Sequence, residues 1–200
     1  MSVRSLVAAL AAMAVMAPAT LRAQEEDIDF AKARKEFIAG QARLSANTLL
    51  TSSLGVRQQL GRCRDETVGT ELLAAEDQLE KLASDLRAGS VKELRTLDLA
   101  LAKIDRTLAH HHLLLVQATM KQPRADNIPV AAHDLDRAAY HFERSVTLAG
   151  GKLTDEQAAA VADIRKLSKD VETTSAFPAS ANATVASFLK LVVPAEVAAK

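Results

Sequence analysis

Residues 91–121, VKELRTLDLALAKIDRTLAHHHLLLVQATMK, carry an unbroken helical pattern in this 200-residue chain. Apolar residues recur there at alternating steps of three and four, which places them on one face of an α-helix. A stripe of this length must be covered, so other helices are expected to pack against it. The one polar member of the stripe is His111, and its apolar members are Leu94, Leu97, Leu101, Ile104, Leu108, Leu115 and Ala118.

The composition favours helices over strands. Hydrophobic residues make up 48% of the chain, but aromatic residues make up only 3% and tryptophan is absent. Strands prefer aromatic and β-branched residues, whereas alanine and leucine are strong helix formers. The predicted fold class is therefore all-α.

The N-terminal half is predicted to contain two helices. The first runs from about residue 24 to 60, and residues 51–55 are the place where it is expected to break or bend. Gly89 is expected to end the second helix, and Ser90 with Glu93 is expected to form a capping box for the helix of residues 91–121. So short a connection makes these neighbours antiparallel. The apolar face of the second helix consists of Val68, Leu72, Ala75, Leu79, Leu82 and Leu86.

The C-terminal half continues the pattern after a polar loop at residues 122–129. Pro129 suits the first turn of a fourth helix, and Gly150 with Gly151 suits its end. Thr154 is expected to cap a fifth helix, and a short sixth helix covers residues 184–193. The predicted architecture is an up-down antiparallel bundle of about four long helices plus one or two short ones, packed in coiled-coil fashion. An open stack of helix pairs is the alternative.

Residues 1–23 have the pattern of a secretory signal peptide. Arg4 supplies the positive start, residues 6–16 supply the apolar run, and residues 17–19 or Ala23 supply a small-residue cleavage site. The apolar run is too short to span a bilayer comfortably, so no membrane span is expected after cleavage, although a retained N-terminal anchor is the alternative. The expected location is periplasmic or secreted. The expected organisation is a signal peptide at 1–23, a helical-bundle domain at 24–194 and a frayed C-terminal tail at 195–200.

The charges and the missing motifs exclude several classes of function. Lys plus Arg equals Asp plus Glu, 25 each, and a neutral chain has no general attraction for nucleic acid. The sequence lacks G-x-S-x-G, a glycine-rich phosphate loop and H-E-x-x-H, and its acidic residues are spread along helix faces. We therefore expect a non-enzymatic protein with no resident cofactor that acts by binding a protein or peptide partner.

The five histidines are the most unusual feature of the sequence. His110, His111 and His112 are consecutive, and His133 and His141 lie on the following helix. His111 falls on the apolar stripe, and its two neighbours flank it by about 100° on either side, so one of the three is expected to face the core.

The five histidines admit three interpretations. Helical bundles hold metals and haem between histidines of facing helices, which gives the hypothesis of a transition-metal or haem site using His111 with His133 or His141. The alternatives are one hydrogen-bonded core histidine with four surface histidines, or a pH-responsive contact. The covalent haem motif C-x-x-C-H is absent.

A second candidate site lies on the fourth helix. Arg137 and Arg144 are seven residues apart on one face, with Tyr140 between them. Arginines bind anionic groups through forked hydrogen bonds, so these three residues are candidates for binding an anionic partner. In the alternative, Asp134 and Asp136 neutralise the arginines on a solvated helix face.

One short segment carries a family resemblance. Leu153-Thr154-Asp155-Glu156-Gln157 resembles the L-T-x-x-Q motif of the Spy and CpxP proteins, which are small helical proteins of the periplasm that bind unfolded clients or metals. The resemblance implies a holdase that works in envelope stress. Helix capping by Thr154 explains the same residues locally.

Overall fold

The computed structural model describes residues 28–193, which form seven helices and no strand. Five helices are long, from 19 to 28 residues, and two are short, with nine and twelve residues. The predicted all-α, up-down bundle is thereby confirmed. The predicted signal peptide and C-terminal tail lie outside the described residues. The helices are α2 (Phe30–Ile38), α3 (Ala42–Leu60), α4 (Glu66–Arg87), α5 (Leu94–Lys121), α6 (Ile128–Leu148), α7 (Asp155–Thr174) and α8 (Ala181–Val192).

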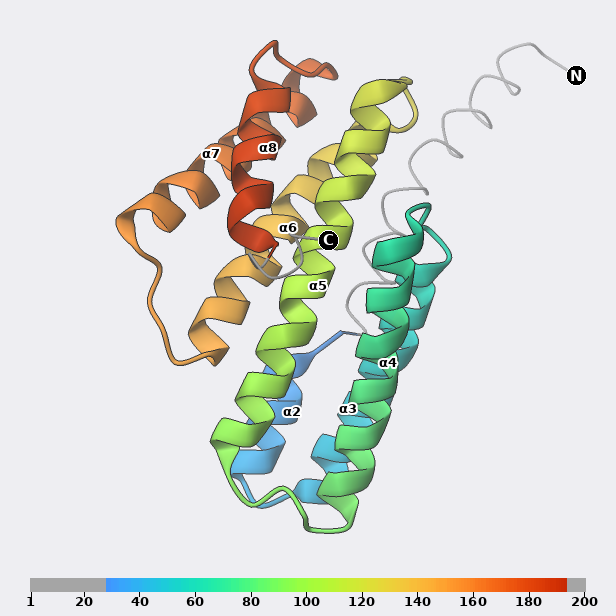
Figure 1. Ribbon diagram of the computed structural model, residues 1–200, viewed down its shortest axis with the longest axis vertical. Coiled ribbons are helices and arrows are strands. Elements are labelled where there is room, and N and C mark those ends of the chain that lie inside the picture. Colours follow the sequence, from blue (N-terminus) through green and yellow to red (C-terminus); the bar gives the residue numbers. More distant parts are fainter. Residues whose placement is uncertain (1–27, 194–200) are drawn as a thin grey trace, which may run out of the picture.

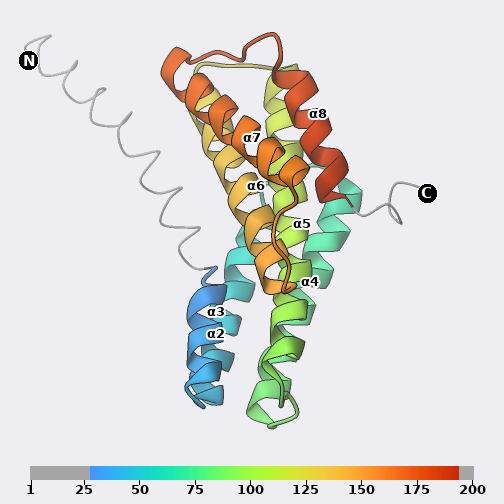
Figure 2. The same cartoon turned by 90° about the vertical axis from the view of Figure 1, so that its left-hand side faces the viewer.

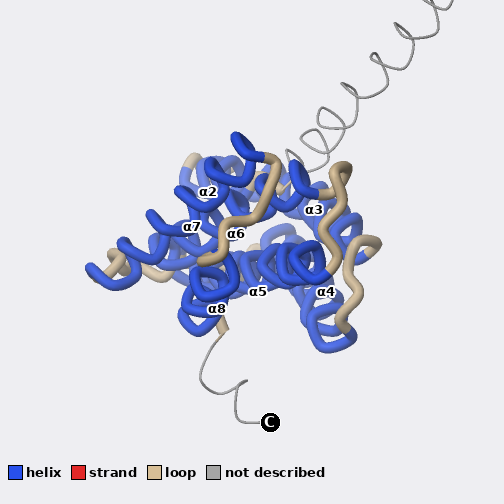
Figure 3. The backbone as a smooth tube through the Cα atoms, turned by 90° about the horizontal axis from the view of Figure 1, so that it is seen from above, coloured by secondary structure: helices blue, strands red, loops and turns tan. Residues whose placement is uncertain are grey.

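Helix α5 organises the molecule. It runs the full length of the bundle, with α2, α3 and α4 along its first half and α6, α7 and α8 along its second half (Figure 1, Figure 2). Seen from above, α5 lies in the middle of the other helices (Figure 3). The buried apolar side chains form two clusters, and α5 contributes to the first as far as Leu108 and to the second from Ala109 onward. Within residues 28–193, no helix is both long and apolar enough to cross a membrane.

The first predicted helix is interrupted at Gly40, so the expectation of one continuous helix was wrong. Gly40 has a positive φ of 73°, a conformation that glycine adopts without steric cost. The amides of Gly40 and Gln41 donate to the carbonyls of Phe37 and Glu36 at 2.9 Å, which closes the end of α2. Residues 51–55, where a bend was expected, are helical throughout.

The other predicted boundaries hold with two exceptions, and one of these is the sixth helix, which begins at Ala181 rather than at residue 184. Gly89, with φ of 70°, follows the end of α4, and Thr154 caps α7 in a capping box with Gln157. The box expected at Ser90 does not form, because α5 begins at Leu94 and its N-cap residue is Glu93, which makes no side-chain capping bond. Pro129 lies in the first turn of α6, as expected.

Helix α5 buries two rows of residues rather than one. The predicted stripe is fully buried from Leu97 to Leu108, but farther along Leu115 is half-buried and Ala118 is exposed. The second row lies beside the first, and it is covered because α2 and α6 pack against this side of the helix. Its members are Asp98, Ala102, Asp105, Ala109, His112 and Val116.

Candidate functional site

The second buried row of α5 forms a polar network with α6. The two helices are antiparallel, and each presents one aspartate and one histidine seven residues apart. The Nδ1 atom of His141 lies 2.9 Å from Asp105, and the Nδ1 atom of His112 lies 2.9 Å from Asp134. Each helix therefore supplies the aspartate of one pair and the histidine of the other.

An arginine completes each pair. Arg144 donates from Nε and Nη2 to the two carboxylate oxygens of Asp105, at 2.7 and 2.6 Å. Arg62, just past the end of α3, donates from Nη2 to both oxygens of Asp134, at 3.0 and 2.9 Å. We call these groups the Asp105 unit (Arg144, Asp105, His141) and the Asp134 unit (Arg62, Asp134, His112).

The two units meet through their histidine rings. His112 and His141 are stacked, with ring centroids 5.6 Å apart and planes inclined by 8°. Asp105 and Asp134 are almost fully buried, as are both histidines. The result is one connected network inside the molecule that joins α3, α5 and α6.

Burial and neighbouring charges set the protonation of the network. Burial lowers the pKa of His141 to about 4, although the hydrogen bond and charge of Asp105 act in the opposite direction. Burial alone raises the pKa of Asp134, but the hydrogen bonds and charges of His112 and Arg62 together bring it below the ordinary value. In the Asp105 unit, an ionised aspartate, a charged arginine and a neutral histidine give no net charge, which suits a buried site.

His111 differs from the two histidines of the network. It is also buried, yet its Nε2 atom is buried without a hydrogen-bond partner among residues 28–193. Burial and the neighbouring His112 lower the pKa of His111 to about 3. The expectation that one of the three consecutive histidines faces the core was wrong, because α5 is covered on two sides and both His111 and His112 are inside.

The residues of the predicted metal site are distributed over α5 and α6. His111 and His141 are buried and His133 is half-buried, and the ring that stacks on His141 is that of His112. Across the described part of the chain, no three or more His, Cys, Asp or Glu side chains are placed to hold one metal ion.

The three residues of the predicted anion site do lie together. The guanidinium groups of Arg144 and Arg137 lie 4.8 and 5.9 Å from the centre of the Tyr140 ring. Arg144 also donates from Nη1 to the Tyr140 hydroxyl at 2.9 Å and lies 4.7 Å from the centre of the Phe30 ring. Its forked hydrogen bonds, expected for an external anion, are made to Asp105 inside the molecule.

Four residues of the network were not predicted: Arg62, Asp105, His112 and Asp134. A signal was present, because Asp98, Asp105 and His112 are spaced by seven residues beside the leucine stripe, and Asp134 and His141 repeat that spacing on the next helix. Polar residues at heptad spacing on two consecutive antiparallel helices indicate a polar seam between them. Arg62 follows a helix end far away in the sequence, and no local pattern marks it.

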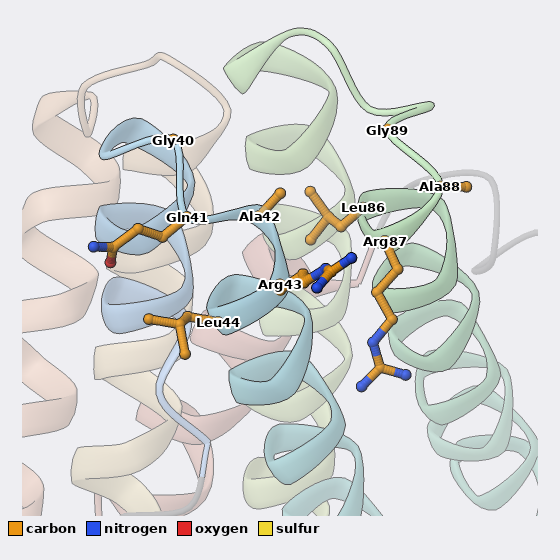
Figure 4. Close-up of a pocket in the computed structure, with 9 residues that line it drawn as sticks. All are labelled: Gly40, Gln41, Ala42, Arg43, Leu44, Leu86, Arg87, Ala88 and Gly89. Atoms are coloured by element: carbon orange, nitrogen blue, oxygen red, sulfur yellow. The ribbon is translucent and has the colours of Figure 1, made fainter.

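The surface of residues 28–193 includes two recesses of comparable size. The end recess, of about 490 Å³, lies between the start of α3 and the end of α4, and its lining includes Arg43, Leu44, Leu86 and Arg87 (Figure 4). The side recess, of about 360 Å³, lies between α4, α5 and the end of α8. Recesses of this kind are common places for a ligand or partner to bind.

Comparisons with known proteins do not identify a relative. No family model matches this sequence, and no curated protein or solved structure matches it. The segment that resembles the L-T-x-x-Q motif forms a helix cap, in which the Gln157 amide donates to the Thr154 hydroxyl at 3.2 Å and the Thr154 amide donates to the Gln157 side chain at 3.0 Å. Function is therefore inferred from the residues and their geometry.

Proposed function

We propose that the protein is exported and acts without catalysis, by binding an acidic and partly apolar segment of a protein partner at the end recess. The observation that carries the proposal is the combination of two arginines with apolar residues at this end of the bundle. Figure 4 shows the Arg43 side chain extending from α3 toward α4 beside Leu86, with Arg87 on the facing helix. Arginines at the rim of an apolar patch are typical of protein interfaces.

The charges at the end recess favour an acidic partner. Arg43 is exposed and has no acidic partner among residues 28–193, and Arg87 donates to the Asn47 side chain rather than to a carboxylate. Two guanidinium groups on facing helices repel each other, and a bound carboxylate relieves that repulsion through charge-assisted hydrogen bonds.

Apolar residues beside the recess supply the second part of the surface. Ile38 and Leu44 are large aliphatic side chains, and they are 60% and 50% exposed. They flank the turn at Gly40, so they lie at the same end of the bundle as the two arginines. Covering such side chains on binding contributes about 25 cal/mol for each Å² of apolar surface removed from water.

The buried network supports a non-catalytic role. The aspartates and histidines that lie close together are almost fully buried, and their oxygens and Nδ1 atoms are engaged with one another. A catalytic acid or base must reach a substrate, and these groups face the interior instead. We expect the mature protein to show no turnover in hydrolase and redox screens, and measured turnover would contradict the proposal.

Binding to synthetic peptides tests the proposed surface. The probe is a peptide with leucine and glutamate at helical spacing, and its counterpart has lysine at every glutamate position. By isothermal titration calorimetry, the glutamate peptide is expected to bind, more weakly as salt is raised, and the lysine peptide is not. Equal binding of the two peptides, or no binding, would contradict the proposal.

Charge reversal locates the binding. The double variant Arg43→Glu with Arg87→Glu should weaken binding of the glutamate peptide by at least about tenfold, because two favourable charge contacts become repulsive. Arg64→Glu is the matched control, since Arg64 is exposed at the opposite end of the α3–α4 pair. An equal loss in the control would show a general charge effect rather than a site.

Export has its own test. Fractionation of cells that make the full chain, followed by N-terminal sequencing, should find the protein outside the cytoplasm with Gln24 as its first residue. A cytoplasmic protein that keeps Met1 would contradict this part of the proposal.

A further inference from the structure

The side recess lies where the two apolar clusters meet. Helix α4 belongs to the first cluster, α8 belongs to the second, and α5 passes beneath both. The apolar part of its lining comes from all three helices: Ala74, Ala75, Ile104, Val192 and Val193. Its volume of about 360 Å³ is in the range of small-molecule sites.

Arg106 lines this recess and is half-buried. Its guanidinium lies 5.4 Å from the centre of the Phe142 ring, which positions the cation without neutralising it. No carboxylate in the described part of the chain pairs with Arg106. A partly desolvated guanidinium without a counter-charge is unfavourable, and a bound anion would remove that cost.

The other charged residues of the recess leave an excess of positive charge. Glu71 is the one acidic residue in the lining, and it lies 3.4 Å from the ring nitrogen of His110. Lys103 is a second cation on the rim. Glu71 disfavours a ligand that carries several negative charges, while Arg106 and Lys103 together favour a ligand with one negative charge.

We propose that the side recess binds a small amphiphilic carboxylate, with its carboxylate on Arg106 and its apolar body along Ala74, Ile104 and Val192. A carboxylate matches the planar fork of the guanidinium. The small side chains of Ala74 and Ala75 leave room in the recess for the apolar body, and Val192 at the end of α8 adds apolar surface to the lining. This site is separate from the end recess and does not depend on the function proposed there.

Octanoate is a suitable probe, with 1-octanol as its uncharged counterpart and octyltrimethylammonium as its cationic one. Isothermal titration calorimetry on the full chain should show octanoate binding, with 1-octanol at least about tenfold weaker. In Arg106→Gln the preference for octanoate over 1-octanol should disappear. Lys103→Gln, which removes an exposed rim charge, is the matched control and should retain most of the preference.

A second variant keeps the proposal testable if Arg106→Gln does not fold. Ala74→Phe places a large side chain at the recess from an exposed position, and it should weaken octanoate and 1-octanol alike, with helix content by circular dichroism unchanged. Equal affinity for octanoate and 1-octanol, unchanged binding in Arg106→Gln, or no binding of octanoate would overturn the proposal. Displacement of octanoate by the glutamate peptide would show that the recess is part of the peptide surface, which would also overturn it.

Discussion

The Asp105 unit and the Asp134 unit use the same three residue types, but they take their arginines from different parts of the chain. Arg144 lies on α6, three residues from the histidine of its own unit, and its side chain is 12% exposed. Arg62 comes from the end of α3, more than seventy residues from Asp134, and its side chain is 23% exposed. The α5–α6 pair therefore contains the whole Asp105 unit, whereas the Asp134 unit needs the N-terminal helices in place.

This difference separates two roles for the same chemistry. The Asp105 unit fixes how α5 and α6 pair, because a shift of either helix would separate a buried carboxylate from its partners. The Asp134 unit in addition ties the N-terminal helices to the C-terminal ones through Arg62.

Removing the aspartate charge should lower the free energy of unfolding more in the Asp105 unit than in the Asp134 unit. Asp105→Asn leaves the well-buried Arg144 without a counter-charge, and the expected loss in the free energy of unfolding is about 3–5 kcal/mol. Asp134→Asn should cost less, since Arg62 is nearer to solvent. Urea denaturation at neutral pH measures both losses. Asp85→Asn, in an exposed pair with Lys81, is the control and should cost less than about 0.5 kcal/mol.

Equal losses in Asp105→Asn and Asp134→Asn would contradict the proposed difference between the units. A loss in the Asp85 control as large as either would show that the substitutions act through general charge instead.

Acidification should weaken the fold through its buried histidines. Burial holds the pKa of His141 at about 4 and that of His111 at about 3, against an ordinary value of 6.5, so the unfolded chain takes up these protons first. Stability should therefore fall as the pH drops from 6.5 toward 4, by up to about 1.4 kcal/mol per pH unit for each histidine. The low pKa of Asp134 adds a loss only at lower pH.

Urea midpoints measured at several pH values between about 3 and 7.5 test this expectation. A flat profile across that window would contradict it. A profile that is steep only below the ordinary aspartate pKa would assign acid sensitivity to the carboxylates rather than to the histidines.

Arg62→Gln should lower the free energy of unfolding by less than Asp105→Asn does, and its effect should be local. It removes the link from α3 to Asp134 but leaves the Asp105 unit intact, and the expected loss is about 1–3 kcal/mol. Hydrogen exchange should speed up at the end of α3, around residues 59–62, and change little at the contact between Asp105 and His141. Arg64→Gln, two residues away and exposed, is the control. Uniformly faster exchange along α5 and α6 would show that the Asp134 unit supports the whole interface.

The contrast between the units also explains how much of the site the sequence could predict. The all-helical fold, most of the helix ends and the leucine stripe from Leu97 to Leu108 follow from local spacing, and these predictions are confirmed. The break at Gly40 was missed because glycine also fits within a helical stripe, and only the closing bonds to Phe37 and Glu36 reveal the end. The Asp105 unit was partly visible, since His141 and Arg144 were both singled out, each for a different purpose.

The Asp134 unit was less accessible to sequence reasoning. Its histidine flanks the predicted stripe, and the apolar spacing predicts only that one side of α5 to be covered. A second covered side requires knowing that α2 and α6 both pack there, which is a property of the tertiary arrangement. Arg62 reaches Asp134 only when the N-terminal and C-terminal helices pack together. The spacing of residues along the chain therefore does not predict this contact.

The unpaired histidine offers the smallest and most specific test. His111 contacts His112, with ring centroids 5.5 Å apart, but its Nε2 atom is buried without a partner among the described residues. His111→Leu makes the stripe apolar at this position and removes the unpaired nitrogen, so the free energy of unfolding at neutral pH should rise by about 1 kcal/mol. The decline in stability below pH 6.5 should also become shallower. His112→Leu, which breaks the bond to Asp134, should destabilise instead.

A loss of stability in His111→Leu would show that Nε2 has a partner in solution. Elemental analysis of the purified protein would then decide whether that partner is the transition metal predicted from the sequence.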